Sequence, residues 1–532
     1  MSFLDTNKPE VLELRKLYEA GLSYNERLKL DETVRVNENN YNWKQWDGVQ
    51  SNGLPTPQIN FMQRVVNHLV ATISTDNLSV LVTILPSAPD KKALHVPVGI
   101  INNEFSALME QLKVVKLTRR MARDACVRGD GCVYVYWDAN AETGQAIKGA
   151  IRAEIIKNNR VFFGNPNSQD VQGQPFIILE QSMSVRDARN EAKRNGNPDW
   201  ELIKADDDNH GVDQAKKTDN KVVVTTLFWK NEGEVYAYRA TKSTWVREAW
   251  SLGIRLYPLV WFPWSNDDGC YHGQSLISGL DMTQQFINKI TAMSGISIID
   301  NAFPRYLYDK TRIKGVDNRV GGAIPVNGGD VNNALKIVSP ASMSPQVFQF
   351  IESVMQMTQE CLGASDVAMG DARPDNAQAI AYLQRAAAIP SELLKEELHD
   401  TTEDLFRIFL EFMISNYGKR KVSVPTTDME REAMAFANSP VEEEKTVEFD
   451  FSTLSDLPLL LKMEAGASSY YSEIAAIQTL DNLLLQGKIT TAQYLKRLPA
   501  SYIPDKTGLI AELEAAEQAP MMLGSQALPT TM

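Results

Sequence analysis

Two stretches with helical periodicity, separated by a long polar and glycine-rich insert, constrain the fold of this chain most strongly. In the first, 275–294, apolar residues recur at steps of three and four, which places them on one helix face. The second, 344–363, opens with Ser344 and Pro345, which favour a helix start, and closes at Gly363. At about 1.5 Å per residue the helices are roughly 30 Å and 28 Å long. We predict that they stand side by side and display the insert at one end. The apolar face of the first helix comprises Leu276, Leu280, Thr283, Ile287 and Ile290.

The length of the chain, 532 residues, predicts more than one domain, because a single hydrophobic core rarely serves more than about 300 residues. Its 43% hydrophobic and 23% charged residues are ordinary for a globular protein. No apolar stretch reaches the roughly 18 residues of a membrane span, and no leader-like N-terminus is evident, so we expect no membrane association. Four cysteines without Cys-x-x-Cys spacing predict reduced thiols: Cys126, Cys132, Cys270 and Cys361.

The net charge of −13 argues against a surface that grips nucleic acid as a whole, because such surfaces carry clustered Lys and Arg. Positive charge does gather in the insert between the two helices. Two interpretations stay open: an ordinary solvated loop, or a surface that faces passing DNA or an acidic partner. The basic residues of the insert are Arg305, Lys310, Arg312, Lys314 and Arg319, against Asp309 and Asp317.

The remaining pattern predicts an α+β fold, with helices before and after a region of short strands. Asn60 is placed to cap an apolar helix, and Pro390 should kink or break a long helix near the C-terminal third. The aromatic residues Tyr41, Trp43 and Trp46 are expected to pack against the helix that follows them. We predict helices over 8–20, 61–74, 98–128, 185–194, 474–485, 490–498 and 507–517, and strands over 78–85, 132–137, 161–163, 175–180, 222–229, 235–239, 259–262, 303–308, 323–326, 335–338 and 447–451.

Short motifs flank the two helices in a recognisable order. Tyr-Pro-Leu-Val at 257–260 and Tyr-His-Gly-Gln-Ser at 271–275 precede the first helix, and Glu-Cys-Leu-Gly-Ala-Ser-Asp at 360–366 ends the second. Gly370 and Arg-Pro-Asp-Asn at 373–376 then lead into another long helix, while Pro-Gln-Ile-Asn at 57–60 precedes an apolar helix upstream. Over about residues 40–420 this order resembles the portal proteins of tailed bacteriophages.

The resemblance implies an α+β portal fold with a mixed α/β wing, a two-helix stem, a small β-containing clip, a long kinked spine helix and a helical C-terminal crown. It implies the following domains: 1–265, the N-terminal part of the wing; 266–300, the first stem helix; 301–343, the clip; 344–362, the second stem helix; 363–376, the tunnel loop; 377–455, the spine helix and the rest of the wing; 456–518, the crown; and 519–532, a disordered tail.

The resemblance also implies a function and partners. The chain would form a ring of about twelve copies at one capsid vertex, the channel through which double-stranded DNA is packaged and ejected. It would dock the terminase large subunit, later the head–tail adaptor and tail proteins, and contact the major capsid and scaffold proteins. The protein would belong to the virion and, during assembly, to the host cytoplasm.

Site residues follow from the same resemblance. Asp281, Gln284, Gln285 and Asn288 would form a polar helix face, with Gln285 and Lys289 lining the channel. The clip docking surface would comprise Lys310, Arg312, Lys314 and Arg319, and the tunnel loop would present Ser365, Asp366, Asp371, Arg373 and Asp375 to DNA.

No motif in the chain predicts catalysis. The sequence has no Gly-x-Ser-x-Gly, no His-Glu-x-x-His and no P-loop, so we expect no enzyme, no metal and no cofactor, and the energy for packaging would come from a separate partner. Carboxylates at 206–208 and 213 lack the spacing of a calcium loop and favour a solvated segment. Two alternatives remain: another phage head–tail structural protein, or a metal-dependent nuclease that uses those carboxylates.

Overall fold

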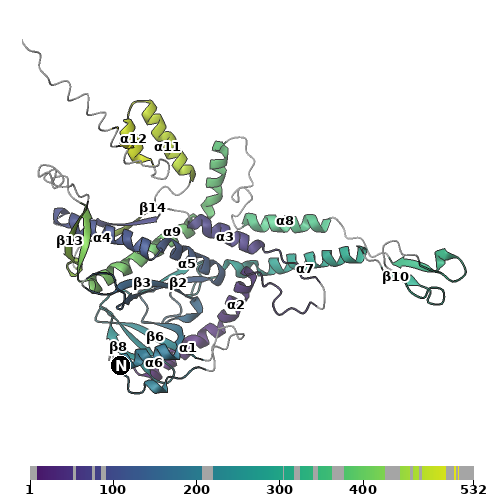
Figure 1. The fold of residues 1–532 in the computed structure, drawn as a ribbon, viewed down its shortest axis with the longest axis horizontal. Coiled ribbons are helices and arrows are strands. Elements are labelled where there is room, and N and C mark those ends of the chain that lie inside the picture. The colour runs from purple at the N-terminus through teal and green to yellow at the C-terminus, as the bar shows by residue number, and fades with distance from the viewer. Residues whose placement is uncertain are drawn as a thin grey trace, which may run out of the picture. The chain divides into compact units, whose positions relative to one another are not determined.

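The computed structural model describes residues 9–51, 55–74, 78–85, 91–145, 147–206, 220–302, 305–316, 324–338, 346–361, 377–425, 444–455, 459–465, 470–498, 509–510 and 513. These residues form an α+β protein, as predicted (Figure 1). The chain divides into two compact units, one comprising Met1–Ser74 and Val80–Met463, the other Thr75–Ser79 and Glu464–Met532.

Three helices open the first unit: α1 (Val11–Arg27), α2 (Leu30–Tyr41) and α3 (Phe61–Ile73). The Asn60 side chain accepts a hydrogen bond from the Gln63 backbone N–H, which confirms the predicted cap. Helix α2 was not predicted, because it buries polar Asn37 and Asn40 on the same face as Val34 and so shows no apolar stripe. Tyr41 and Trp43 donate hydrogen bonds to Asn67 and Gln63 of α3, in line with the predicted packing, whereas Trp46 donates to Pro57 O in the segment before α3.

The predicted helix over 98–128 is two helices, α4 (Lys91–Gln111) and α5 (Val114–Arg128). Lys113 separates them with a left-handed backbone, φ 51°. Its Cβ makes that conformation costly for a residue other than glycine, and sequence periodicity alone gives no sign of it. After the break, Val114, Leu117 and Met121 of α5 are buried in the core.

Two antiparallel sheets form the rest of this region. The three-stranded sheet has the order β3 (Ala150–Ile156), β2 (Asp130–Asp138), β9 (Leu259–Pro263). The five-stranded sheet runs β4 (Val161–Phe163), β5 (Phe176–Ser184), β6 (Lys221–Asn231), β7 (Glu234–Ala240), β8 (Trp245–Ser251). Strands β3 and β8 were not predicted. Helix α6 (Val185–Arg194) is the helix predicted at 185–194, capped by Ser184.

Helix α7 (Leu276–Ala302) confirms the predicted first long helix and extends eight residues beyond its predicted end at residue 294. Two short strands follow, β10 (Arg305–Tyr308) and β11 (Leu335–Val338), which pair antiparallel. The strand predicted at 323–326 is wrong for the described residues 324–326, which are irregular. Helix α8 (Gln346–Cys361) confirms the second long helix, and its Phe350 ring meets Phe286 of α7 edge-on at 6.1 Å.

Helix α9 (Ala377–Asn416) continues through Pro390, so the helix does not break there, and a kink at Pro390 stays a prediction. After it, β12 (Lys419–Pro425) pairs with β13 (Glu444–Asp450), and β14 (Leu459–Ala465) pairs with β1 (Leu78–Ile84). The described part of the second unit contains α11 (Tyr470–Leu485) and α12 (Thr491–Arg497), which match two predicted helices, whereas most of 507–517 lies outside the described residues. Short 3₁₀ turns lie at Asn158–Arg160, Trp200–Leu202, Val331–Asn333 and Phe451–Leu454. None of the helices in the described ranges has the length and apolarity to cross a bilayer.

One large core joins α3, α4, α5, the three-stranded sheet and the second half of α9. Phe406 of α9 is fully buried and packs edge-on against Phe105 of α4 at 4.9 Å. Ile277, Leu280 and Ile287 bring the first half of α7 into the same core. We call this region the body: α1–α6, the two larger sheets and residues 391–416 of α9. Helices α7 and α8 are the helix pair, and the described residues 305–316 and 324–338 are the head.

Candidate functional site

The start of α7 is fixed to the body by a buried polar network. The Asp130 carboxylate, at the start of β2, accepts hydrogen bonds from Gly273 N–H at 2.6 Å and Asn158 Nδ2 at 3.1 Å. It also lies 2.9 Å from His272 Nδ1, and both side chains are buried. Ser275 Oγ donates to the last carbonyls of α5, those of Cys126 and Val127. These bonds set where α7 begins and the direction in which it leaves the body.

Close backbone packing at this point explains one glycine. A Cβ on Gly273 would lie 2.9 Å from the Gly129 carbonyl oxygen and 2.9 Å from the Ser265 carbonyl oxygen. Those distances are shorter than real Cβ contacts, so any side chain at Gly273 would push the segment before α7 away from Gly129 and Ser265. The motif at 271–275, taken from the resemblance, therefore has a structural role in this chain.

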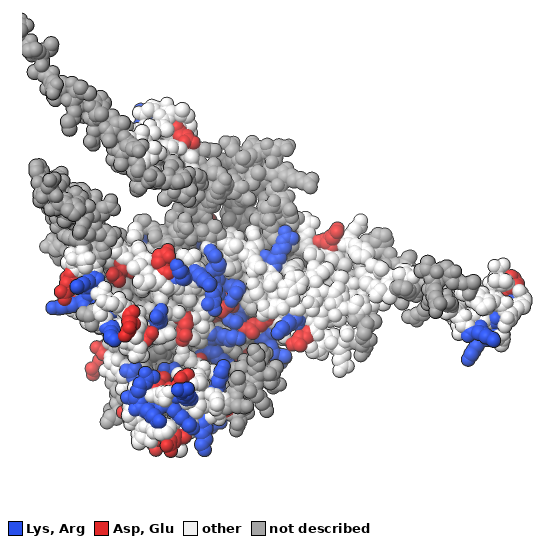
Figure 2. All heavy atoms as spheres, in the orientation of Figure 1, with Lys and Arg blue, Asp and Glu red and all other residues white. Residues whose placement is uncertain are grey.

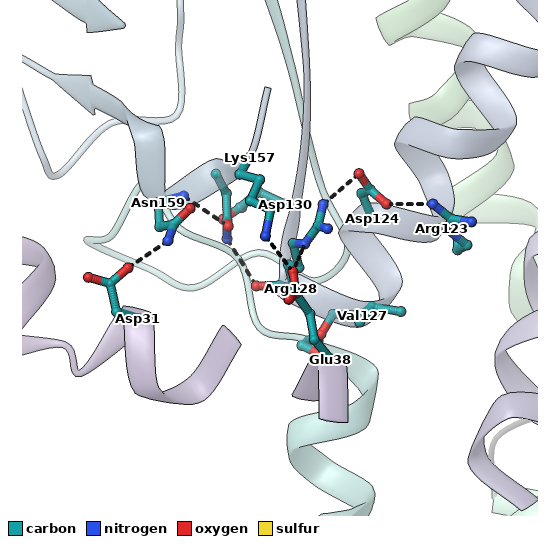
Figure 3. A network of polar contacts seen from close by, with 11 residues as sticks. Asp31, Glu38, Arg123, Asp124, Val127, Arg128, Asp130, Lys157 and Asn159 are labelled. Carbon is teal, nitrogen blue, oxygen red and sulfur yellow. Dashed lines mark hydrogen bonds and ion pairs between the residues drawn. The ribbon is translucent and has the colours of Figure 1, made fainter. Parts of the chain in front are cut away.

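Figure 3 shows the outer part of the same network, where α2 and α5 meet. Arg128 donates to Glu38 at 2.7 Å and to Asp124 at 2.6 Å, and Lys157 donates to Glu38 at 3.0 Å. Partial burial acts to raise the pKa of Glu38, but the two cations outweigh it and hold the pKa below its ordinary value. The network joins α2, α5 and the chain after β3 into one rigid base for α7.

The polar face predicted on α7 is largely buried. Gln284 and Asn288 are about 1% and 2% exposed, and they donate to Ile59 O and to Gln45 Oε1. Asp281 accepts from Asn40 of α2 at 2.7 Å and from Gln285 at 2.9 Å. Most of the predicted polar face therefore anchors α7 to α2 and to the loop that follows α2.

Gln285 and Lys289 are exposed and line a pocket of about 240 Å³ between α7 and the end of α2. Its other walls include Asn39, Lys44 and Trp46. The structure thus brings together the two residues predicted to line a channel, on the side of α7 that is accessible to solvent in the single chain.

The sequence analysis did not predict how apolar the accessible side of the helix pair is. Met282 and Met293 of α7 are 78% and 64% exposed, and Met357 of α8 is 65% exposed. Phe286, Phe348 and Phe350 are also exposed. The signal was present in the spacing: Met282, Phe286 and Met293 follow one helix stripe opposite to Leu280 and Ile287.

Charge is correspondingly scarce on the helix pair. The two helices contain five charged residues, Asp281, Lys289, Asp300, Glu352 and Glu360. Figure 2 shows this part of the molecule as a nearly white surface beside a body covered with blue and red. An accessible helix surface with so few charges and so many apolar side chains is unusual for a chain that works alone, because apolar area in water is unfavourable by about 25 cal/mol per Å².

The head contains three of the four residues predicted as a docking surface. Lys310 and Lys314 are exposed, whereas Arg312 donates to the Gly328 carbonyl and to the Asp330 carbonyl, the latter at 2.9 Å. Arg312 therefore holds the turn after β10 against the segment before β11, and its charge is partly committed to the fold of the head. The fourth residue, Arg319, lies outside the described residues.

All five residues predicted for the tunnel loop, Ser365, Asp366, Asp371, Arg373 and Asp375, lie outside the described residues as well. So do most of the carboxylates considered for a metal site. Asp206 is described, and its carboxylate accepts from the Val223 backbone N–H at 2.7 Å. Within the ranges given above, no three His, Cys, Asp or Glu side chains are grouped so that they could hold a metal ion.

No protein-family model and no curated protein matches this chain.

Proposed function

We propose that this chain is a ring-forming portal subunit, in which the helix pairs of neighbouring copies pack side by side around a central channel. The observation that carries the proposal is the accessible apolar side of α7 and α8, from Met282 to Met293 on one helix and from Phe348 to Met357 on the other. A surface of this kind is stable when a second protein covers it. The order of motifs around the two helices resembles that of portal proteins, and this resemblance is the reason for proposing a portal ring in particular.

A second copy of the same chain is the simplest partner for such a surface. A contact between two different sides of one subunit, repeated by rotation, closes into a ring when the angle permits. The head adds to the argument, since its two strands are too few to be stable by themselves and Leu307, Val331 and Ile337 are exposed. Pairing with the heads of neighbouring copies would bury these side chains.

The ring would serve as the passage for double-stranded DNA into and out of a capsid vertex. The heads would dock the terminase large subunit during packaging and the adaptor and tail proteins afterwards, through Lys310 and Lys314. The body would contact the major capsid and scaffold proteins. The protein would have no catalytic role of its own, and residues 363–376 would contact the passing DNA.

The test is the mass of the purified full-length protein, measured by mass photometry and by counting symmetry in negative-stain images. We expect closed rings for the wild type. The double variant Met282→Gln, Met293→Gln should remain folded but lose most of the ring population, because both substitutions place amides on the apolar surface of α7.

The matched control is Leu12→Gln, Val96→Gln, which changes two similarly exposed apolar side chains on α1 and α4. It should leave the rings intact. A wild-type protein that is monomeric at micromolar concentration, or a control that loses rings as completely as the α7 variant, would contradict the proposal.

A further inference from the structure

The outer face of α3 and α5 is strongly basic, although the protein is acidic. Residues 113–123 contain five Lys or Arg and no Asp or Glu, and residues 60–74 contain Arg64 and no Asp or Glu. Since the whole chain carries −13, the rest of the molecule carries −13 − 6 = −19. This group is denser than the basic residues of the head, and it was not predicted to form a binding surface. The five basic residues between 113 and 123 are Lys113, Lys116, Arg119, Arg120 and Arg123.

The packing of α5 directs these side chains outward. Val114, Leu117 and Met121 are buried against the core, so that Lys116, Arg119 and Arg120 lie on the opposite side and are exposed. Lys113, Lys116 and Arg120 are separated by three and four residues and share one stripe of the helix. From 113 to 123 the row is about 15 Å long.

Helix α3 extends this row into a surface. Arg119 Nε donates to Ser74 Oγ at the C-terminal end of α3 at 3.2 Å, which fixes the two helices together. Arg64 and Asn67 are exposed on α3. Burial lowers the pKa of the neighbouring His68, and the positive charge of Arg64 lowers it further. Figure 2 shows blue side chains gathered over the region of α3 and α5, next to the charge-poor helix pair.

Carboxylates balance only part of the charge on residues 113–123. Lys113 pairs with Glu110 at 3.2 Å and Arg123 with Asp124 at 3.2 Å, both in partly exposed positions. Lys116 and Arg120 form no ion pair with any carboxylate in the described ranges. Unpaired cations held together on a rigid helix repel one another, and a polyanion that binds there would remove the repulsion.

We propose that the face formed by Arg64, Lys113, Lys116, Arg119 and Arg120 binds the phosphodiester backbone of double-stranded DNA without regard to sequence. The duplex carries one negative charge per about 1.7 Å of its length, so the row from Lys113 to Arg120, about 10 Å long, faces several phosphates. A protein partner fits less well, because protein interfaces have an apolar core depleted in Lys, and the apolar side chains exposed here are small, Ala71 and Val115.

The experiment measures binding of the full-length protein to a short fluorescent duplex of mixed sequence, by anisotropy over a series of salt concentrations. The variant is Lys116→Gln, Arg120→Gln, which removes two unpaired charges and no hydrogen bond of the fold. If two phosphate contacts are lost, the slope of log K against log salt should become shallower by about 2, with weaker binding at low salt.

The matched control is Lys310→Gln, Lys314→Gln, which removes the same charge from the head and should leave the salt slope unchanged. The charge-preserving variant Lys116→Arg, Arg120→Lys should bind as the wild type does, which separates charge from packing. An unchanged slope in the α5 variant, or an equal loss in the control, would overturn the proposal.

Two further outcomes distinguish this inference from the proposed ring, on which it does not depend. If the α5 variant binds DNA normally but loses rings, the basic face is an interface between copies, and the DNA proposal is wrong. If wild-type protein is monomeric yet shows the salt-dependent loss in the α5 variant alone, the DNA proposal stands and the ring proposal fails.

Discussion

The body and the helix pair with its head solve the problem of burying apolar surface in opposite ways. In the body, aromatic residues from distant parts of the chain meet in one core, and even a buried carboxylate such as Asp130 has three polar neighbours. In the helix pair, methionine and phenylalanine side chains of similar size are left in water. The body buries its apolar residues within the single chain, whereas the helix pair would bury its exposed ones only in the ring that we propose.

This difference shows that helix periodicity reports where a helix forms but not how many of its sides are covered. Helix α7 has two apolar stripes, one packed on the body and one accessible. Substitutions in the two regions should therefore differ in their effect on stability.

The first prediction compares two phenylalanines. Phe406→Ala empties a fully buried site in the body and should lower the free energy of unfolding by about 4 kcal/mol. Phe350→Ala on α8, which is 52% exposed, should lower it by less than about 1 kcal/mol in the separated chain. Urea unfolding followed by circular dichroism, at a protein concentration that holds both variants monomeric, measures both values. Equal losses would mean that α8 is as fully packed as the body.

The second prediction concerns the base of α7. Asp130→Asn keeps the size of the side chain but removes a buried negative charge and replaces one of two carboxylate oxygens, each of which now accepts a hydrogen bond, by an NH₂ group. We expect a loss of about 3 kcal/mol, because buried donors are left without an acceptor.

The matched control for this variant is Asp138→Asn, at the other and more accessible end of β2, where the nearest cation is 3.9 Å away. It should cost less than about 0.5 kcal/mol. Thermal unfolding of both variants tests the pair, and a mild effect at Asp130 would show that the network does not hold α7 in place.

The third prediction concerns the head. Arg312→Ala removes the donors to the Gly328 and Asp330 carbonyls and should destabilise the head locally by about 1 kcal/mol. Hydrogen exchange should become faster in 305–316 and 324–338 and stay unchanged in the body. Lys310→Ala, which removes an exposed side chain on the same turn, is the control. Faster exchange throughout the body in Arg312→Ala would mean that the head and the body unfold together.

The fourth and smallest prediction concerns a carboxyl group in the body. Burial raises the pKa of Glu104 above its ordinary value of 4.5, although nearby Arg420 opposes the shift. The folded state therefore favours the protonated form, and this contribution to stability is lost as the pH rises through the raised pKa. Because the side chain is only half-buried, Glu104→Gln should stabilise the protein by about 0.5 kcal/mol at neutral pH.

The difference between Glu104→Gln and the wild type should shrink below the ordinary pKa of the carboxyl group, where Glu104 is neutral in both the folded and the unfolded chain. Melting temperatures at neutral and acidic pH measure it, with Glu110→Gln, at an exposed position of the same helix, as the control. A stabilisation that is the same at both pH values would show that charge is not its cause.

Helices and strands that depend on neighbouring residues in the sequence could be predicted from the sequence alone. The cap at Asn60, the apolar stripe of α7, the helix at 185–194 and most strands of the larger sheets follow from residue type and spacing along the chain. The order of helix, polar insert and helix was readable for the same reason, as was the shortage of charge that sets the helix pair apart.

The contacts that each helix face makes could be learned only from the three-dimensional structure. It buried Gln284 and Asn288 against α2, committed Arg312 to two carbonyls and broke one predicted helix at Lys113. It also placed the basic side of α5 beside α3, a surface assembled from segments that are far apart in the chain. Such outcomes depend on the energy of contacts between distant residues, which no pattern along the chain contains.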